Sequence, residues 1–353
     1  MVDFAQEASG APFASRAQRT QRKVTVTDKA TPTGATGEPK VRFVEATEEE
    51  SGQRIDNWLV RTLKGVPKSH LWRIIREGQV RVNRKKVEAS YKLAAGDVVR
   101  IPPVRTASRP ARPAPAAIPA GAIPVLYEDR DIVVLDKPAH MAVHGGSGVS
   151  FGLIERLRAT RPEAALELVH RLDKETSGVI VVAKTRKALV RLHEAIRLGQ
   201  VRKTYAALLL GDFEPSVRHV KLALKKYLTR EGERRVRVDD EGLASHSVFR
   251  KVQAFGRATL VDVELLTGRT HQIRVHAASI GHPIAGDDKY GDFAMNDAIA
   301  KGAFGAPFKR MFLHARRIAF THPVTREELT IEAPLPIECA QLIQALKAHD
   351  PQI

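Results

Sequence analysis

Two short segments of this 353-residue sequence carry side chains that could perform chemistry. The first runs from His170 to Gly178 and combines a histidine, an arginine, an aspartate and turn-forming residues directly before an apolar run at residues 179–183. The second runs from Thr267 to His276 and is dense in groups that bind anions or pair with a carboxylate. Loops on a rigid sheet often carry catalytic groups. A structural Arg–Asp pair and a helix cap are the alternative interpretations, and spacing alone leaves both open.

Patterns typical of metal or nucleotide sites are missing from the sequence. It has no GxxxxGK[ST] phosphate loop, and the Gly-Gly-Ser-Gly run at 145–148 does not match GxGxxG. The His-Glu pair at 193–194 lacks the second histidine of HExxH, and His271 and His276 are five residues apart, not four. The adjacent aspartates at 287–288 would point apart in an extended segment, so we interpret them as loop residues. We therefore expect no metal and no cofactor.

The elements that must position the two segments belong to one large domain, which we expect at residues 123–350. Strands interleave with two helices, one closed by Gly199 and one capped by Thr270 and ended by Gly281. Strands outnumber helices without regular βαβ alternation, which favours an α+β fold over a doubly wound sheet. The predicted strands are 132–135, 179–183, 201–210, 258–266, 316–320 and 329–332, and the helices span about 189–196 and 271–280.

A small basic module precedes this domain at residues 52–104. Ile55, Leu59 and Leu63 recur at helical spacing, and a second helix is expected between Ser69 as N-cap and Gly78. Strands follow around residues 80–82 and 98–101. Residues 52–105 hold thirteen Lys and Arg against four acids, so this surface can follow a phosphate backbone. The residues expected to bind RNA are Arg73, Arg76, Arg81, Arg84, Lys85 and Lys86.

The composition of the chain limits its possible partners and its cellular location. The 57 Lys and Arg exceed the 40 Asp and Glu by 17, an excess that attracts polyanions such as nucleic acid. The single cysteine, Cys339, cannot form an internal disulfide, and no apolar run approaches a membrane span. We expect a cytoplasmic protein that does not enter the membrane. Residues 1–45 lack hydrophobic periodicity and predict a disordered tail, and the Pro, Ala and Arg of residues 105–122 predict a linker.

Three motifs resemble those of a known family. The run from His170 to Gly178 resembles the signature loop of the RluA-type pseudouridine synthases, which modify ribosomal and other RNAs. Residues 203–205 resemble the second motif of that family and residues 266–276 the third, in the same order and at the same spacing. The module at 52–104 is similar to the S4 RNA-binding domain that many members carry. The resemblance implies a central mixed, largely antiparallel sheet flanked by helices from residue 123 onward.

The same resemblance implies an enzyme that isomerises uridine to pseudouridine. Asp173 matches the catalytic aspartate of the family, and Arg274 matches the arginine that pairs with it and favours its charged form. Tyr205 matches the tyrosine that stacks on the base and assists transfer of the C5 proton. The expected substrate is RNA, most of all large-subunit ribosomal RNA, and the expected state is a monomer.

Three further residues are expected to bind the substrate, two of them because they match residues of the family. Ile273 matches the side chain that packs on the other face of the uracil. Arg171 matches the arginine that enters the space left by the target nucleotide, which must leave its stack before reaction. His170, in the same loop, is expected to contact the substrate.

Two other functions remain open from the residues alone. The first is a metal-independent ribonuclease, with His170 or His271 as acid and base, which would need both histidines at one phosphate. The second is a non-catalytic RNA-binding or ribosome-assembly factor built on the basic module. Neither explains why three synthase motifs occur together in order.

Overall fold

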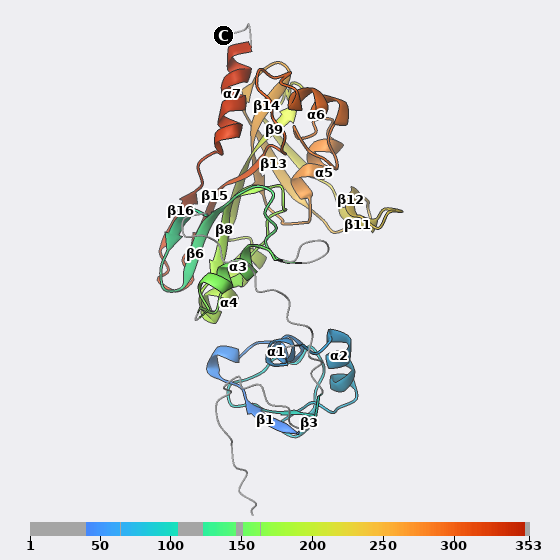
Figure 1. Ribbon diagram of the computed structural model, residues 1–353, viewed down its shortest axis with the longest axis vertical. Coiled ribbons are helices and arrows are strands. Elements are labelled where there is room, and N and C mark those ends of the chain that lie inside the picture. Colours follow the sequence, from blue (N-terminus) through green and yellow to red (C-terminus); the bar gives the residue numbers. More distant parts are fainter. Residues whose placement is uncertain (1–39, 64, 105–122, 146–150, 163, 350–353) are drawn as a thin grey trace, which may run out of the picture. The chain divides into compact units, whose positions relative to one another are not determined.

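The computed structural model describes residues 40–63, 65–104, 123–145, 151–162 and 164–349, which fall into two compact units (Figure 1). The tail expected at residues 1–45 lies outside the described part up to residue 39. Its last residues do not fit the expectation, because Arg42–Glu45 form a strand, β1, that pairs with Val98–Ile101. The expected linker at 105–122 lies wholly outside the described residues.

The first unit packs two helices against a four-stranded sheet in the order β1-β4-β2-β3. Residues on one face of each helix supply the core: Ile55, Trp58 and Leu59 are buried on the first helix, and Leu71 and Ile75 on the second. The helical spacing of these apolar residues explains why both segments are amphipathic. The elements are β1, the 3-10 helix η1 Glu48–Glu50, α1 Ile55–Thr62, α2 Lys68–Arg76, β2 Arg81–Val82, β3 Lys85–Lys86 and β4 Val98–Ile101.

The start of α2 differs from the expectation. Pro67, not Ser69, is the N-cap, and its carbonyl accepts the first hydrogen bonds, from the backbone N–H groups of His70 and Leu71. Proline suits a helix start because its φ is already fixed near the required value and it has no N–H to leave unpaired. The predicted end is confirmed, because Gly78 follows the C-cap with a φ of +73°.

The second unit is built on a ten-stranded sheet whose main path runs β10-β13-β14-β9-β15-β8-β6-β5, with β16 beside β15 and β7 beside β8. Within the described residues, every strand pair of this sheet is antiparallel except β8 with β15, so the expectation of a mixed, largely antiparallel sheet is confirmed. The strands of the main sheet are β5 Val125–Glu128, β6 Ile132–Lys137, β7 Glu167–Leu168, β8 Ser177–Ala183, β9 Arg202–Leu210, β10 Val217–Lys221, β13 His246–Ala254, β14 Ala258–Leu265, β15 Leu313–Thr321 and β16 Glu328–Glu332.

Both faces of the central strands are covered. On β8, Ile180 and Val182 belong to one buried cluster, whereas Val179 and Val181 belong to another on the opposite face, next to α4. Successive side chains of a strand point to opposite faces, which is why every residue of β8 is apolar or small. The helices are α3 Leu153–Thr160, α4 Arg186–Arg197, α5 Gln272–Ser279, α6 Phe293–Ala300 and α7 Ile337–His349.

A hairpin and a helix start stand close together on this unit. The two-stranded hairpin of β11 (Leu224–Leu228) and β12 (Arg234–Val238) projects from its body beside α5 (Figure 1). Helix α5 begins after His271, which adopts a left-handed φ of 52°, so the expectation that Thr270 caps this helix is wrong. His271 makes no side-chain cap hydrogen bond, and Oε1 of Gln272 accepts the Arg269 N–H in the turn before the helix. In the described part of the chain, no helix is long and apolar enough to cross a membrane.

Candidate active site

A cavity of about 550 Å³ opens where the loop before β8 faces the start of α5. The segments 170–178 and 267–276, which are far apart in the sequence, both contribute residues to its wall. All six residues expected to act in catalysis or substrate binding line it: His170, Arg171, Asp173, Tyr205, Ile273 and Arg274. The structure therefore brings together the residues that the three motifs contribute.

The loop that carries Asp173 is held at both ends. Leu172 is buried in the core, and the carbonyl of Asp173 accepts the Thr176 N–H at 3.2 Å, which closes a turn. Gly178 then enters β8 with a φ of +109°, and a Cβ there would lie 2.2 Å from the Ala315 carbonyl oxygen. Only glycine allows this close approach of β8 to β15. The aspartate side chain is left 18% exposed, at the cavity wall.

Lys137 supports the same loop from inside the protein. Its ammonium group donates to the carbonyls of Pro138, Met141 and Lys174, and its side chain is wholly buried. The three acceptors use all three N–H groups of a lysine. Because the Lys174 carbonyl directly follows Asp173, this lysine fixes the backbone at the candidate catalytic residue. This role was not predicted from the sequence, where the only signal was a lysine at the end of a strand expected to be buried.

Tyr205 and Ile273 provide the apolar part of the wall, from β9 and α5. They are 7% and 4% exposed. Burial raises the pKa of the Tyr205 hydroxyl well above its ordinary value, and the negative charge of Asp173 adds to the rise. The phenol is therefore neutral throughout the physiological range and is a poor general base.

His170 and Arg171 differ in their surroundings. The Nε2 of His170 accepts the backbone N–H of Val181 at 3.1 Å, which turns that side of the ring toward β8. Burial lowers the pKa of His170 to about 3, so the ring is neutral. Arg171 is exposed at the cavity rim and is free to meet a charged ligand.

Arg274 does not make the ion pair that was expected of it. Its guanidinium binds Asp287 twice, at 2.7 and 2.5 Å, and Asp288 once, at 2.9 Å, so its direct partners are these two loop aspartates and not Asp173. Burial alone would lower the pKa of Arg274, but the hydrogen bonds and charge of Asp287, with a contribution from Asp173, raise it. The charge of Asp173 thus acts on the Arg274 guanidinium although the two side chains do not pair. The third nitrogen, Nη1, is buried and has no hydrogen-bond partner among the described residues.

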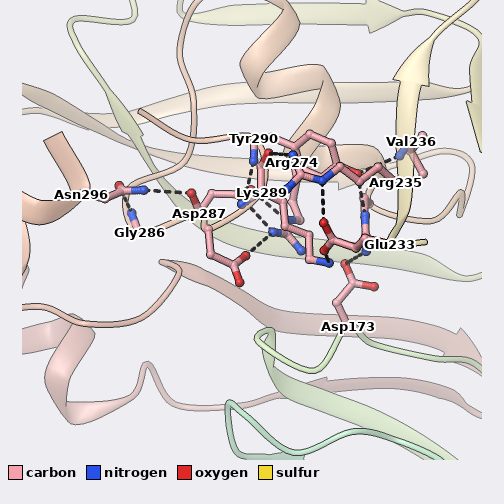
Figure 2. A network of polar contacts seen from close by, with 12 residues as sticks. Asp173, Glu233, Arg235, Val236, Arg274, Gly286, Asp287, Lys289, Tyr290 and Asn296 are labelled. Carbon is pink, nitrogen blue, oxygen red and sulfur yellow. Dashed lines mark hydrogen bonds and ion pairs between the residues drawn. The ribbon is translucent and has the colours of Figure 1, made fainter. Parts of the chain in front are cut away.

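A chain of polar contacts joins this arginine to the carboxylate (Figure 2). The Tyr290 ring lies 5.2 Å from the Arg274 guanidinium carbon, and its hydroxyl accepts the Val236 N–H. That hydroxyl also lies within hydrogen-bond distance of Nδ1 of His271, at 2.8 Å. Nε2 is 3.9 Å from Oδ2 of Asp173.

The segment from Asp287 to Tyr290 is the part of this arrangement that was not assigned from the sequence. Asp287 is wholly buried, and burial would raise its pKa, but Arg274 holds that pKa below its ordinary value. The N–H groups of Lys289 and Tyr290 also donate to its Oδ1. The interpretation of residues 287–288 as loop residues is confirmed for their position. Among the described residues, no three His, Cys, Asp or Glu side chains gather as a metal site would require.

The basic residues that the sequence singled out in the first unit lie on α2 and on the hairpin formed by β2 and β3. Asn83 and Arg84 both have positive φ, at 48° and 68°, as the two central residues of a type I′ hairpin turn require. None of the six makes an ion pair with a described acidic side chain. The six exposed cations are Arg73, Arg76, Arg81, Arg84, Lys85 and Lys86.

Comparisons with known proteins agree with this site. Residues 131–279, which include all three motifs, match the family model for RNA pseudouridylate synthase, and residues 53–99 match that of the S4 domain. The proteins called ribosomal large subunit pseudouridine synthase C in Salmonella typhimurium and Escherichia coli are each 50% identical over 313 residues, spanning 88% of this chain and 98% of theirs.

The chain belongs to the pseudouridine synthase family. It is an isomerase that acts on uridine in RNA, and its first unit is an S4 domain. Among solved structures it is similar to human RNA pseudouridylate synthase domain containing 4, with a TM-score of 0.51 and 27% identity over 63% of this chain and 92% of that one. The fold and the family expected from the three motifs are confirmed.

Proposed function

We propose that this synthase isomerises specific uridines of large-subunit ribosomal RNA, with Asp173 as the catalytic carboxylate. The observation that most supports this proposal is that one cavity holds Asp173 beside a buried guanidinium and an apolar wall. The names of its relatives support the choice of RNA, because proteins half identical to it are called synthases of the large ribosomal subunit. The exposed cations of the S4 domain supply the means to hold a phosphate backbone.

In this proposal Asp173 acts on the target nucleoside directly. The reaction breaks the N1–C1′ bond, turns the uracil and rejoins it through C5. Cleavage at an anomeric carbon builds positive charge on the sugar, which a carboxylate stabilises or attacks, as in glycoside hydrolysis. One carboxylate suffices because the base stays in the pocket and no water has to be activated.

The other residues bind and orient in the proposal. Tyr205 and Ile273 hold the two faces of the uracil, and the neutral phenol restricts Tyr205 to packing and hydrogen bonding. Removal of the C5 proton is then assigned to Asp173, whose carboxylate lines the same cavity. Arg274 supplies positive charge through its unpartnered Nη1, and His170 shapes the pocket as a neutral ring.

Arg171 has a different part in the proposal. The target uridine must leave its stack to enter the cavity. Arg171 stands exposed at the rim, so its guanidinium can occupy the vacated space and meet the surrounding phosphates.

We also propose the domain boundaries, the cellular location and the oligomeric state. The S4 domain at 52–104 binds the RNA backbone, residues 105–122 connect it, and the domain at 123–350 carries out the reaction. We place the reaction in the cytoplasm and assign it to a monomer. The ribonuclease alternative is not favoured, because Nε2 of His170 is already bonded to β8.

The test is to incubate the protein with large-subunit ribosomal RNA transcribed without modifications, in EDTA once the RNA has folded. The proposal expects pseudouridine at a few defined uridines and RNA of unchanged length. Shortened RNA would identify a nuclease, and bound RNA with unaltered nucleosides would identify a binding protein. Either result would overturn the proposal.

A further inference from the structure

The two tryptophans of the S4 domain have opposite environments. Trp58 on α1 is 1% exposed and belongs to the core, whereas Trp72 on α2 is 58% exposed. The buried face of α2 consists of Leu71, Ile74 and Ile75, so Trp72 has no part in holding the helix to the sheet. A large aromatic ring left in solvent gains nothing for folding and is typical of a contact surface.

The surroundings of Trp72 are cationic. Lys68 precedes it by four residues and Arg76 follows it by four, so the three side chains share one face of the helix. Arg73 adjoins this face, where its Nη2 lies 2.9 Å from Nδ1 of His70. In the part of the chain that the structure describes, no acidic side chain pairs with Lys68, Arg73 or Arg76. We call Lys68, Trp72 and Arg76 the α2 face.

The combination of an exposed aromatic ring with two cations indicates which class of molecule the α2 face binds. A protein-binding patch would surround the aromatic ring with further apolar side chains at its centre, with charges only at the rim. The α2 face has the reverse arrangement, with one ring between two cations that have no described acidic partner. Single-stranded nucleic acid has matching chemistry, because its bases stack on aromatic rings and its phosphates pair with lysine and arginine.

We propose that the α2 face binds an unpaired nucleotide of the RNA substrate. The base stacks on the Trp72 ring, and the flanking phosphates meet Lys68 and Arg76. The inference rests on the proposed function for its choice of RNA and adds a second contact to it. The basic residues Arg84–Lys86 would contact only the phosphates of the RNA backbone. The α2 face would also select a base that is free to stack.

The structure supplies the reporter for a test. Because Trp58 is buried, a short RNA that stacks on the protein should quench mainly the emission of Trp72. The experiment titrates the full chain with a ten-nucleotide oligouridine and, separately, with the same RNA annealed into a fully paired duplex. We expect quenching and tighter binding with the single strand.

Two kinds of substitution separate stacking from charge. Trp72→Ala lacks the reporter, so its binding is followed by the anisotropy of a labelled oligouridine. It should weaken single-strand binding about 5- to 150-fold, the range of one base stack, without changing the salt dependence. Trp72→Phe should restore most of the affinity. Lys68→Gln and Arg76→Gln should each make the slope of log K against log salt shallower by about 0.7, because each removes one phosphate contact. Val98→Ala, which removes an exposed apolar side chain from β4 of the same domain, is the matched control and should have no effect.

The outcomes distinguish this inference from the proposed function. If the emission does not respond to RNA, or if Trp72→Ala binds like the parent, the inference is overturned, even while the parent still makes pseudouridine. Self-association that depends on Trp72 without any RNA effect would overturn it too, in favour of a contact between copies of the chain. If Trp72 responds as expected but no pseudouridine forms, the proposed function fails and the binding face stands.

Discussion

Arg274 and Asp287 form a two-point ion pair in which Nε is 2.7 Å from Oδ2 and Nη2 is 2.5 Å from Oδ1, with both side chains only 1% exposed. Two parallel bonds fix the plane of the guanidinium as well as its position. The remaining nitrogen, Nη1, is then buried without a described partner, and Arg274 is one of the residues that line the cavity containing Asp173. Asp287 therefore fixes the position of the positive charge of Arg274, close to the carboxylate that we propose to be catalytic.

Asp287→Asn should damage both stability and turnover. Loss of one partner of a buried ion pair leaves the other charge uncompensated, so the free energy of unfolding should fall by about 3 kcal/mol. Turnover should fall at least about tenfold, a barrier increase of about 1.4 kcal/mol, because Arg274 loses its fixed orientation. Asp288→Asn is the matched control, since its side chain is 60% exposed, and it should cost less than about 1 kcal/mol. Equal effects of the two substitutions, measured by denaturant unfolding and by pseudouridine formation, would contradict this assignment.

Arg171→Ala should slow reaction on a paired target more than on an unpaired one. If Arg171 fills the space left by the extruded uridine, its loss should cost little when the uridine is already bulged. The measurement compares rates on two fragments that differ only in the pairing of the target. Lys174→Ala, which removes a cation from the same loop, should not discriminate between the fragments. A uniform loss of rate with Arg171→Ala would show that it serves general binding.

The basic turn should set part of the salt dependence of RNA binding. Replacing Arg84, Lys85 and Lys86 together with glutamine should make the slope of log K against log salt shallower by about 2, at roughly 0.7 per phosphate contact on single strands. Arg317→Gln on β15 is the control, because this arginine already lies 3.4 Å from Glu332. An unchanged slope in the triple variant would exclude the turn from the RNA interface.

Buried histidines should make the protein sensitive to acid. Burial lowers the pKa of His314 to about 4, from about 6.5 in the unfolded chain. Between these values the unfolded chain takes up a proton that the folded protein does not, so the free energy of unfolding should decrease as the pH falls. One such group contributes a slope of about 1.4 kcal/mol per pH unit. His314→Gln should flatten the dependence by that amount, and identical slopes for variant and parent between about pH 6 and 4.5 would contradict it.

The periodicity of the sequence predicted most of the sheet because the elements repeat a simple pattern. Apolar runs, whose side chains point alternately to two buried faces, predicted β8 and β14. Glycines at 78 and 199 correctly predicted two helix ends. Helix starts were harder. At α2 and α5 the expected hydroxyl caps are wrong, because Pro67 and His271 hold the N-cap positions and neither makes a side-chain cap hydrogen bond.

The cavity residues could be identified in the sequence, but their pairing could not. The partner of Arg274 lies thirteen residues away in a loop whose position depends on Asn296, which donates to the Asp287 carbonyl and accepts the Gly286 N–H (Figure 2). No local pattern encodes such a contact, because it requires the tertiary arrangement of α5 and the chain before α6. The neutral state of His170 has the same origin, since it depends on the burial of its ring against β8.

Replacement of Asp173 by asparagine tests the central claim most directly. Asparagine keeps the shape of the side chain but removes its charge and its nucleophilic oxygen. RNA affinity should stay near that of the parent, because it comes from cations elsewhere, while turnover should fall by several orders of magnitude. The measurement is pseudouridine formed per enzyme on a ribosomal RNA fragment, with binding followed in parallel. If Asp173→Asn retains a rate within about tenfold of the parent, a barrier difference below about 1.4 kcal/mol, Asp173 is not the catalytic carboxylate.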